Sequence, residues 1–413
     1  MKQIIAASRS RHHAGIPSYC TSHPETLRAI FRSYRDNAKP ILIEATCNQV
    51  NQDGGYTGMK PVDFREFVVG LAREANVDTS RIILGGDHLG PNPWKNLPAS
   101  QAMAKARDLV RHYVEAGFTK IHLDASMACA DDRDLTETEM AARAAELCAV
   151  AEAYVGAHKL LYVIGTEVPI AGGETEILAG LAVTRPEAAL RAYDLHRAAF
   201  AKRGLEAAVA RVIGIVVQPG VDFGNSQIFA FDKLKAAGLA LVINQIPNAA
   251  FEAHSTDYQT PQALRDLVAS RFAILKVGPE LTAAYREAIV AMACIEDRLP
   301  IAEKSSIMSV IAKVMDADPK YWQDYIASDA RTELMKIFGL SDRIRYYWPN
   351  GAIQSALKIL HANIDRASNE IGLVTQFVEL PERQTLPLSQ EIIQTKVGRV
   401  VAKYSSACHS PSS

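Results

Sequence analysis

The sequence has no apolar run long enough to cross a lipid bilayer. Its longest runs, such as VIGIVV at 212–217, fall far short of the roughly 20 residues that a membrane helix needs. An excess of positive charge is also absent, because 45 Lys and Arg residues face 46 Asp and Glu residues, for a net charge of −1. Neither a membrane nor a nucleic acid is therefore an expected partner.

Paired cysteines and targeting signals are missing as well. The six cysteines show no CxxC pair and no framework spacing, so neither disulfides nor a thiolate metal cage is indicated. The first residues, MKQIIAASRSRHHAG, contain no apolar core of the kind found in secretory signal peptides. We therefore expect a cytoplasmic protein with reduced thiols.

The sequence does contain short apolar runs rich in Ile and Val, each followed by a turn and an amphipathic segment. Their hydrophobicity is continuous rather than alternating, which is typical of parallel strands buried on both faces. Eight such runs occur, at 15–20, 40–46, 81–88, 120–126, 161–167, 211–220, 251–256 and 272–279. Eight strand and helix units predict an α/β fold, a (β/α)8 TIM barrel over residues 10–299.

Helix signals complete this prediction. Thr136 with Glu139, and Thr184 with Glu187, precede helical patterns and are predicted to form capping boxes. From about residue 300 onward the pattern is helical only. We expect residues 300–413 to form a helical C-terminal extension packed on the barrel.

Polar side chains gather at the predicted carboxyl ends of the strands, where the active sites of barrels lie. The two-residue period of a strand directs at least one of them from most strands toward the same mouth. These residues are Glu44, Thr46, Asp87, His88, His122, Asp124, Ser126, Glu167, Gln218, Glu252, His254 and Lys276. Any one of them could belong to a structural ion pair. Together they favour a pocket for a polyhydroxylated or phosphorylated small molecule.

The charges of this pocket do not balance, because five acids face one lysine. An unpaired buried carboxylate is strongly unfavourable, so we expect a compensating cation. The five acids are Glu44, Asp87, Asp124, Glu167 and Glu252, and the lysine is Lys276. A divalent metal, with zinc as the first choice, would take His88, Glu167 and His254 as ligands, supported by Asp87 or Gln218.

Other residues have roles that the pattern leaves more open. Lys276 could form a Schiff base, but surrounding carboxylates favour a protonated counter-ion. His122 is interpreted as a core histidine. Arg343 or Arg345 could cap a phosphate or attach the extension to the barrel. The phosphate and substrate contacts predicted on the loops and strand ends are Gln218, Ser255, Thr256 and Gly278, together with Arg343.

Several strings resemble one known family, the Z subunits of D-tagatose-1,6-bisphosphate aldolase. They include IEATCNQVNQDGGYTGM, RIILGGDHLGPNPW, AGFTKIHLDASMACA, FEAHSTDYQT and LSDRIRYYWP, and the resemblance runs from about residue 10 to about residue 350. It implies a cytoplasmic protein of galactitol or N-acetylgalactosamine catabolism that stabilises and activates a catalytic Y subunit. That Y subunit is a zinc-dependent class II aldolase, which splits tagatose 1,6-bisphosphate into two triose phosphates.

The family has also been labelled tagatose-6-phosphate kinase, and related proteins resemble metal-dependent 4-epimerases of ketose phosphates or uronates. No GxxxxGK[ST] signature appears, which disfavours kinase chemistry. His88 and His254 resemble two of the three zinc histidines of class II aldolases, but the sixth and eighth predicted strands carry Gln218 and Lys276. This departure argues against autonomous aldolase activity.

The accessory-subunit and epimerase interpretations both remain open, as does a homo-oligomer. In either case the resemblance implies a sugar-phosphate ligand such as tagatose 6-phosphate. The corresponding hypothesis gives Asp124 or Glu44 the role of proton-transfer base, with Asp87 beside them. Lys276 then neutralises developing negative charge.

Overall fold

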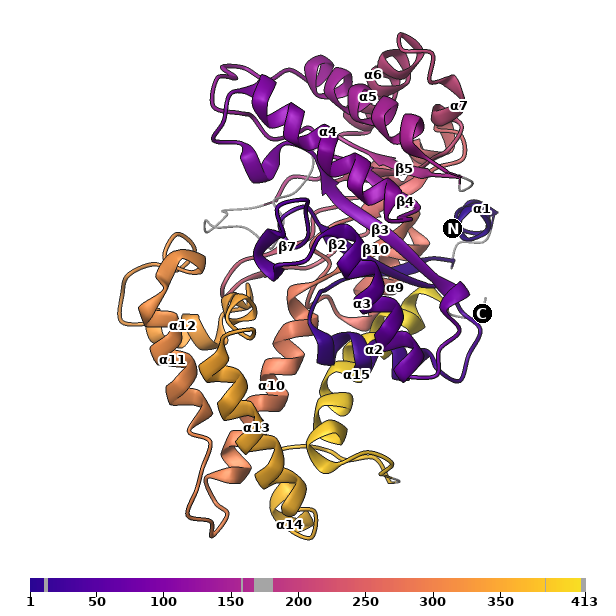
Figure 1. The fold of residues 1–413 in the computed structure, drawn as a ribbon. Helices are drawn as coiled ribbons and strands as arrows, with labels where there is room; N and C mark the ends of the chain where they lie inside the picture. Colours follow the sequence, from indigo (N-terminus) through magenta and orange to yellow (C-terminus); the bar gives the residue numbers. More distant parts are fainter. Residues whose placement is uncertain (11–13, 157–158, 167–180, 383, 410–413) are drawn as a thin grey trace.

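The computed structural model describes residues 1–10, 14–156, 159–166, 181–382 and 384–409 (Figure 1). Its centre is a closed barrel of eight strands in the order β1-β10-β9-β6-β5-β4-β3-β2, in which every neighbouring pair is parallel. The strands are β1 (Ile16–Cys20), β2 (Ile41–Thr46), β3 (Ile82–Leu89), β4 (Lys120–Leu123), β5 (Leu161–Ile164), β6 (Val212–Val217), β9 (Ala250–Ala253) and β10 (Phe272–Val277). The predicted (β/α)8 barrel is confirmed.

The helices that follow the strands form the outer layer. They are α2 (Pro24–Tyr34), α3 (Pro61–Glu74), α4 (Ala99–Glu115), α5 (Glu137–Tyr154), α6 (Pro186–Ala201), α7 (Glu206–Val209), α8 (Ala237–Val242), α9 (Pro261–Ala269) and α10 (Pro279–Glu296). The Thr136–Glu139 capping box is present at α5. The second predicted box is wrong: α6 has Arg185 at its N-cap, and Thr184 Oγ1 instead accepts the backbone N–H of Gln218 at 2.9 Å.

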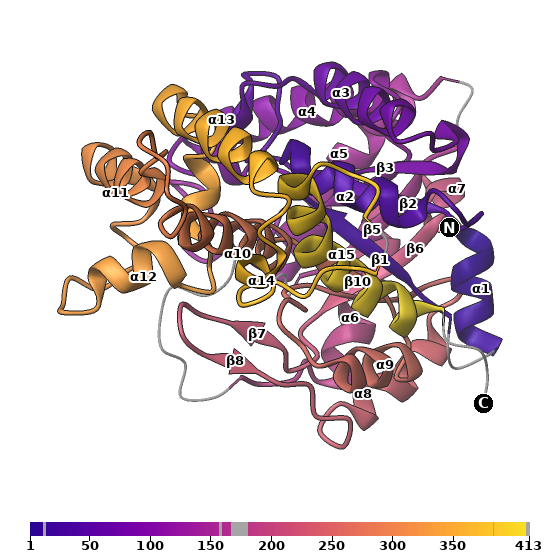
Figure 2. The same cartoon turned by 90° about the horizontal axis from the view of Figure 1, so that it is seen from below.

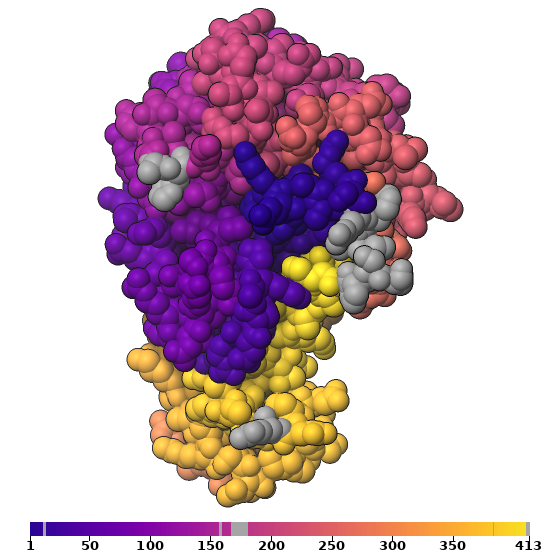
Figure 3. Space-filling view, turned by 90° about the vertical axis from the view of Figure 1, so that its right-hand side faces the viewer, coloured from indigo at the N-terminus to yellow at the C-terminus, as the bar shows by residue number. Residues whose placement is uncertain are grey.

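Short elements complete the barrel. Helix α1 (Lys2–Ser10) packs against β9 and β10 and is exposed on the face seen in Figure 3, where it is indigo. Its Arg9 donates to the carbonyl oxygens of Ile243, Ile246 and Ala249. A two-stranded antiparallel ribbon, β7 (Asp222–Phe223) and β8 (Ile228–Phe229), follows β6. The 3-10 helices are η1 (Gly55–Thr57), η2 (Thr79–Arg81), η3 (Asn92–Trp94), η4 (Ile243–Gln245), η5 (Pro319–Tyr321) and η6 (Arg343–Tyr346).

The C-terminal part is helical, as predicted. It comprises α11 (Ile307–Ala317), α12 (Thr332–Phe338), α13 (Gly351–Arg366), α14 (Ile371–Val374) and α15 (Leu388–Cys408). Helix α10 is buried on nearly every face, because it packs against α11, α13 and α15. Helix α15 then returns to pack against α2, α9 and β1, so the last helix completes the outer layer of the barrel (Figure 2).

The barrel interior is layered. An apolar lower layer fills the end nearest α1 and includes Ile5, Ile16, Leu42, Val163, Ile213 and Ile274. Polar side chains occupy the strand positions toward the carboxyl ends. None of the helices in the described part of the chain combines the length and the apolar character needed to span a bilayer.

Candidate functional site

A layer of paired charges fills the middle of the barrel. Lys120 Nζ, at the start of β4, lies 2.7 Å from Glu44 Oε1 and 2.9 Å from Glu252 Oε2, and these side chains have no solvent exposure. Lys276 Nζ lies 3.0 Å from Glu44 Oε2 and 2.7 Å from Asp87 Oδ1. The expectation that the acids face a single lysine is therefore wrong, because Lys120 is a second buried cation.

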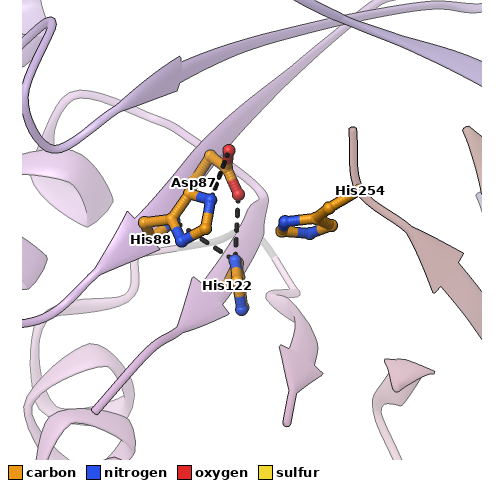
Figure 4. Close-up of side chains that lie close together, drawn as sticks. All are labelled: Asp87, His88, His122 and His254. Carbon is orange, nitrogen blue, oxygen red and sulfur yellow. Dashed lines mark hydrogen bonds and ion pairs between the residues drawn. The ribbon is translucent and has the colours of Figure 1, made fainter. Parts of the chain in front are cut away.

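Three histidines and an aspartate meet above this layer (Figure 4). Asp87 and His88 lie at the end of β3, His122 lies on β4, and His254 follows β9. Their potential ligand atoms all lie within 4.8 Å of one another. His122 Nδ1 is 2.9 Å from Asp87 Oδ1, whereas its buried Nε2 has no hydrogen-bond partner among the described residues.

Further carboxylates orient two of the histidines. His88 Nδ1 lies 2.8 Å from Asp124 Oδ2, and Asp124 Oδ1 accepts hydrogen bonds from the backbone and hydroxyl of Ser126. His254 Nε2 lies 3.0 Å from Glu252 Oε1. A carboxylate bound to one imidazole nitrogen fixes the ring and leaves the other nitrogen free for a metal ion.

The backbone near the end of β3 contributes to the orientation of the His88 side chain. Its backbone has a φ of 50°, in the left-handed region that a non-glycine residue occupies at a cost of about 1 kcal/mol. Ser255, after β9, has a similar φ of 53°. Such strained residues cluster at functional sites, where the surrounding structure holds them in place.

Burial and the neighbouring carboxylates set the protonation states of the cluster. Burial opposes ionisation, but His88 and Lys276 hold the pKa of Asp87 below its usual range. Burial lowers the pKa of His254 to about 3, so this ring is neutral. Burial also disfavours the imidazolium form of His88, yet Asp87 and Asp124 outweigh it and raise the pKa of His88.

The charges among the described residues still favour a cation. With His88 in the neutral form that a metal ion requires, four carboxylates and two lysines leave two negative charges, and the groups counted are Glu44, Asp87, Asp124, Glu252, Lys120 and Lys276. A divalent ion would balance them. Imidazole nitrogens with a carboxylate oxygen form a donor set that suits zinc and similar transition metals, so the residues present fit the expected group.

A cavity of about 400 Å³ opens beside the cluster. The predicted site residues that line it are Asp87, His88, Ser255, His254, Lys276 and Gly278. Glu44 and Asp124 lie behind this lining, where they are bonded to Lys276 and His88. Glu167 lies outside the described residues. The volume is within the range of small-molecule sites.

Three predicted contacts lie elsewhere. Gln218 Oε1 accepts two backbone N–H groups of its own turn, at 2.8 and 3.0 Å. Thr256 Oγ1 donates to a backbone carbonyl oxygen on β10 at 2.7 Å. Arg343 Nε donates to the carbonyl oxygen of Tyr321 at 2.6 Å, and its guanidinium lies 3.5 Å from the ring centre of Tyr325.

Sequence reasoning missed several residues that the structure brings to the site. Lys120 shares the inward face of β4 with His122 and Asp124, so the two-residue period could have found it. The same period selects His122, but its interpretation as a core histidine overlooked its place in the cluster of potential metal ligands. Tyr56 in η1 and Tyr346 in η6 were also missed, and they line the cavity together with Arg345, one of the two arginines considered for a phosphate. Nothing in their spacing indicates this, because the packing of the extension brings η6 to the barrel mouth.

Comparisons with known proteins identify the family. The family described as "D-tagatose-1,6-bisphosphate aldolase subunit GatZ/KbaZ-like" matches residues 1–409. The GatZ subunits of Salmonella typhimurium LT2 and Salmonella paratyphi B are each 46% identical to this chain, with 99% of both chains covered.

A solved structure is also similar over nearly the whole length. The crystal structure of a "probable tagatose 6 phosphate kinase" from Sinorhizobium meliloti 1021 superimposes with a TM-score of 0.87 at 44% identity, covering 95% of this chain and 100% of that chain. The family match and the two Salmonella relatives extend over the barrel and the extension alike. This chain therefore belongs to the GatZ/KbaZ-like family of D-tagatose-1,6-bisphosphate aldolase subunits.

Proposed function

We propose that this chain is the Z-type subunit of a cytoplasmic tagatose-1,6-bisphosphate aldolase in galactitol or N-acetylgalactosamine catabolism. In this role it stabilises and activates a separate class II catalytic chain. The observation that carries the proposal is the 46% identity to GatZ subunits over 99% of the chain. The site departs from the class II pattern in where its third imidazole comes from: the sixth and eighth strands carry Gln218, which is bonded within its own turn, and Lys276, whereas His122 on β4 supplies the third ring.

The cavity of this subunit is proposed to bind a sugar phosphate beside a divalent ion, with zinc as the first choice. Asp87, His88, His122 and His254 would hold the ion, which polarises a carbonyl or hydroxyl oxygen when bound. Lys276 stays protonated, because Asp87, Glu44 and Glu252 raise its pKa despite burial. It therefore presents a positive charge to a substrate oxygen rather than a free amine for a Schiff base.

An assay with and without the catalytic chain tests the proposed role. The purified Z-type chain is incubated with tagatose 1,6-bisphosphate, tagatose 6-phosphate and fructose 6-phosphate, first alone and then with the class II catalytic subunit. We expect cleavage of the bisphosphate only when both chains are present, at a higher rate than the catalytic chain alone achieves. Epimer formation or ATP-dependent phosphorylation by the Z-type chain alone would contradict the proposal.

Metal content is a second measurable consequence. Because Asp124 orients His88 from behind, Asp124→Asn should weaken metal affinity by about 10- to 100-fold. Elemental analysis and competition with a chelator measure the change. Asp132→Asn is the control, since Asp132, which is 12% exposed, also binds a cationic side chain, that of Arg143, outside the cluster. Equal metal affinity in both variants would contradict the assigned ligand set.

A further inference from the structure

The cavity has a second polar region, which the C-terminal extension supplies. Arg345 in η6 lines the cavity together with Tyr346, and Tyr56, Gln49 and Ser22 line it from the barrel loops. Arg345 Nη2 donates to the hydroxyl oxygen of Tyr346 at 2.9 Å, and its guanidinium carbon lies 4.5 Å from the ring centre of the same residue. These contacts fix the guanidinium at the cavity wall.

The charge of Arg345 has no carboxylate partner within ion-pair distance among the described residues. Its Nη1 donates only to backbone carbonyl oxygens, those of Ser341 and Asp342. The Asp342 carboxylate is occupied by Arg286 Nη1 at 2.8 Å and by the hydroxyl of Thr282 at 2.5 Å. Lys276, the other cation that lines the cavity, is by contrast paired with three carboxylates.

The neighbours of Arg345 are hydrogen-bond donors. The rings of Tyr56 and Tyr346 meet edge to face with their centres 4.6 Å apart. Burial is the main reason that the pKa of Tyr56 rises to about 12, so its hydroxyl keeps its proton. Gln49 Oε1 accepts the backbone N–H of Thr46 at 2.8 Å, which leaves the Gln49 amide nitrogen as a donor.

The two polar regions stand over different parts of the barrel rim. Ser22 follows β1, and Gln49 and Tyr56 follow β2, whereas the histidines stand on β3, β4 and β9. The histidine region carries surplus negative charge, and the Arg345 region carries an unpaired positive charge. An elongated ligand with an anionic end would therefore bind in one orientation only.

We propose that Arg345, Tyr346 and Tyr56 form a binding site for a phosphate monoester, which orients a phosphorylated ketose with its sugar oxygens toward His88 and His254. A guanidinium with hydroxyl donors beside it suits the several acceptor oxygens of a phosphate dianion. The inference rests on the proposed sugar-phosphate role of the cavity, and it names the residues that select the phosphate.

Calorimetric titration of the full-length chain tests this site. The ligands are tagatose 6-phosphate, unphosphorylated tagatose and inorganic phosphate, each with metal-loaded and with chelator-treated protein. Arg345→Gln should weaken binding of tagatose 6-phosphate by about 10- to 100-fold and leave binding of tagatose unchanged. Arg331→Gln is the matched control, because it removes one positive charge from an exposed position of the extension outside the cavity lining.

A second variant guards against a folding defect in Arg345→Gln. Tyr56→Phe removes one hydroxyl only, and about fivefold weaker binding of tagatose 6-phosphate is expected. The inference is overturned if folded Arg345→Gln binds tagatose 6-phosphate as tightly as the wild type, if phosphate binding disappears with the metal, or if a hexuronate binds better than the phosphate. The titration contains no catalytic subunit. If the chain failed to activate that subunit in the assay described above, the proposed role would be wrong, but the measured phosphate binding would still hold.

Discussion

Lys120→Met should lower the free energy of unfolding by about 3–5 kcal/mol. Lys120 is the cation shared by Glu44 and Glu252, and none of the three side chains has measurable exposure. A methionine side chain has a similar length but no charge, so the negative charges of Glu44 and Glu252 lose one of the two lysines that balance them. Burial then opposes their ionisation, and the cost appears as lost stability or as uptake of a proton.

Denaturant unfolding at neutral pH measures this loss. The matched control is Lys105→Met, because Lys105 pairs with Asp53 at 3.2 Å while the two side chains are 42% and 54% exposed. An exposed pair of this kind contributes about 1 kcal/mol or less. Adding Glu252→Gln to Lys120→Met should recover part of the loss. If Lys120→Met costs no more than the control, the buried layer of charges does not stabilise the fold.

The fold was predictable because each strand of a parallel barrel is buried on both faces. Continuous apolar runs such as 81–88 and 272–279 therefore stand out, and the corresponding strands are Ile82–Leu89 and Phe272–Val277. The same regularity directs Asp87, His88 and His254 to one mouth, where the structure places them. No sequence pattern of this kind predicts that α15 packs against α2 and α9, because that contact joins segments far apart in the chain.

The charge balance was harder to predict. The two-residue period that selects His122 and Asp124 also reaches Lys120, but a lysine at the start of a strand is usually exposed. Its burial depends on Glu44 and Glu252, which come from two other strands. The case for a metal consequently rests on four described carboxylates and two lysines rather than on five acids and one lysine.

Alternation along a strand also says little about residues beyond its end. Gln218 follows the last residue of β6, and its amide turns back onto its own loop. In η6, Arg343 and Arg345 are two residues apart on a tight turn, and only Arg345 lines the cavity. The direction of each side chain is set by hydrogen bonds and ring contacts that the sequence pattern does not encode.

Gly90→Ala should destabilise the protein by at least about 3 kcal/mol and should also disturb the histidine cluster. A Cβ atom on residue 90 would lie 1.6 Å from the carbonyl oxygen of Asp124, far closer than any non-bonded contact. The obstacle is backbone and cannot rotate away. Separation of the two segments would break the hydrogen bond from the Asp124 N–H to the Leu89 carbonyl oxygen, which is 3.1 Å long.

Because Asp124 orients His88, the same displacement should reduce metal content as well as stability. Chemical unfolding and elemental analysis of the purified variant measure the two effects together. Gly70→Ala is the matched control, since no atom other than those of the surrounding helix backbone lies within 4 Å of its added Cβ in α3. That change should stabilise the helix by about 0.5–1 kcal/mol. The prediction is contradicted if Gly90→Ala unfolds at the same denaturant concentration as the wild type and keeps its metal content. In that case the close approach of Gly90 to Asp124 does not position His88.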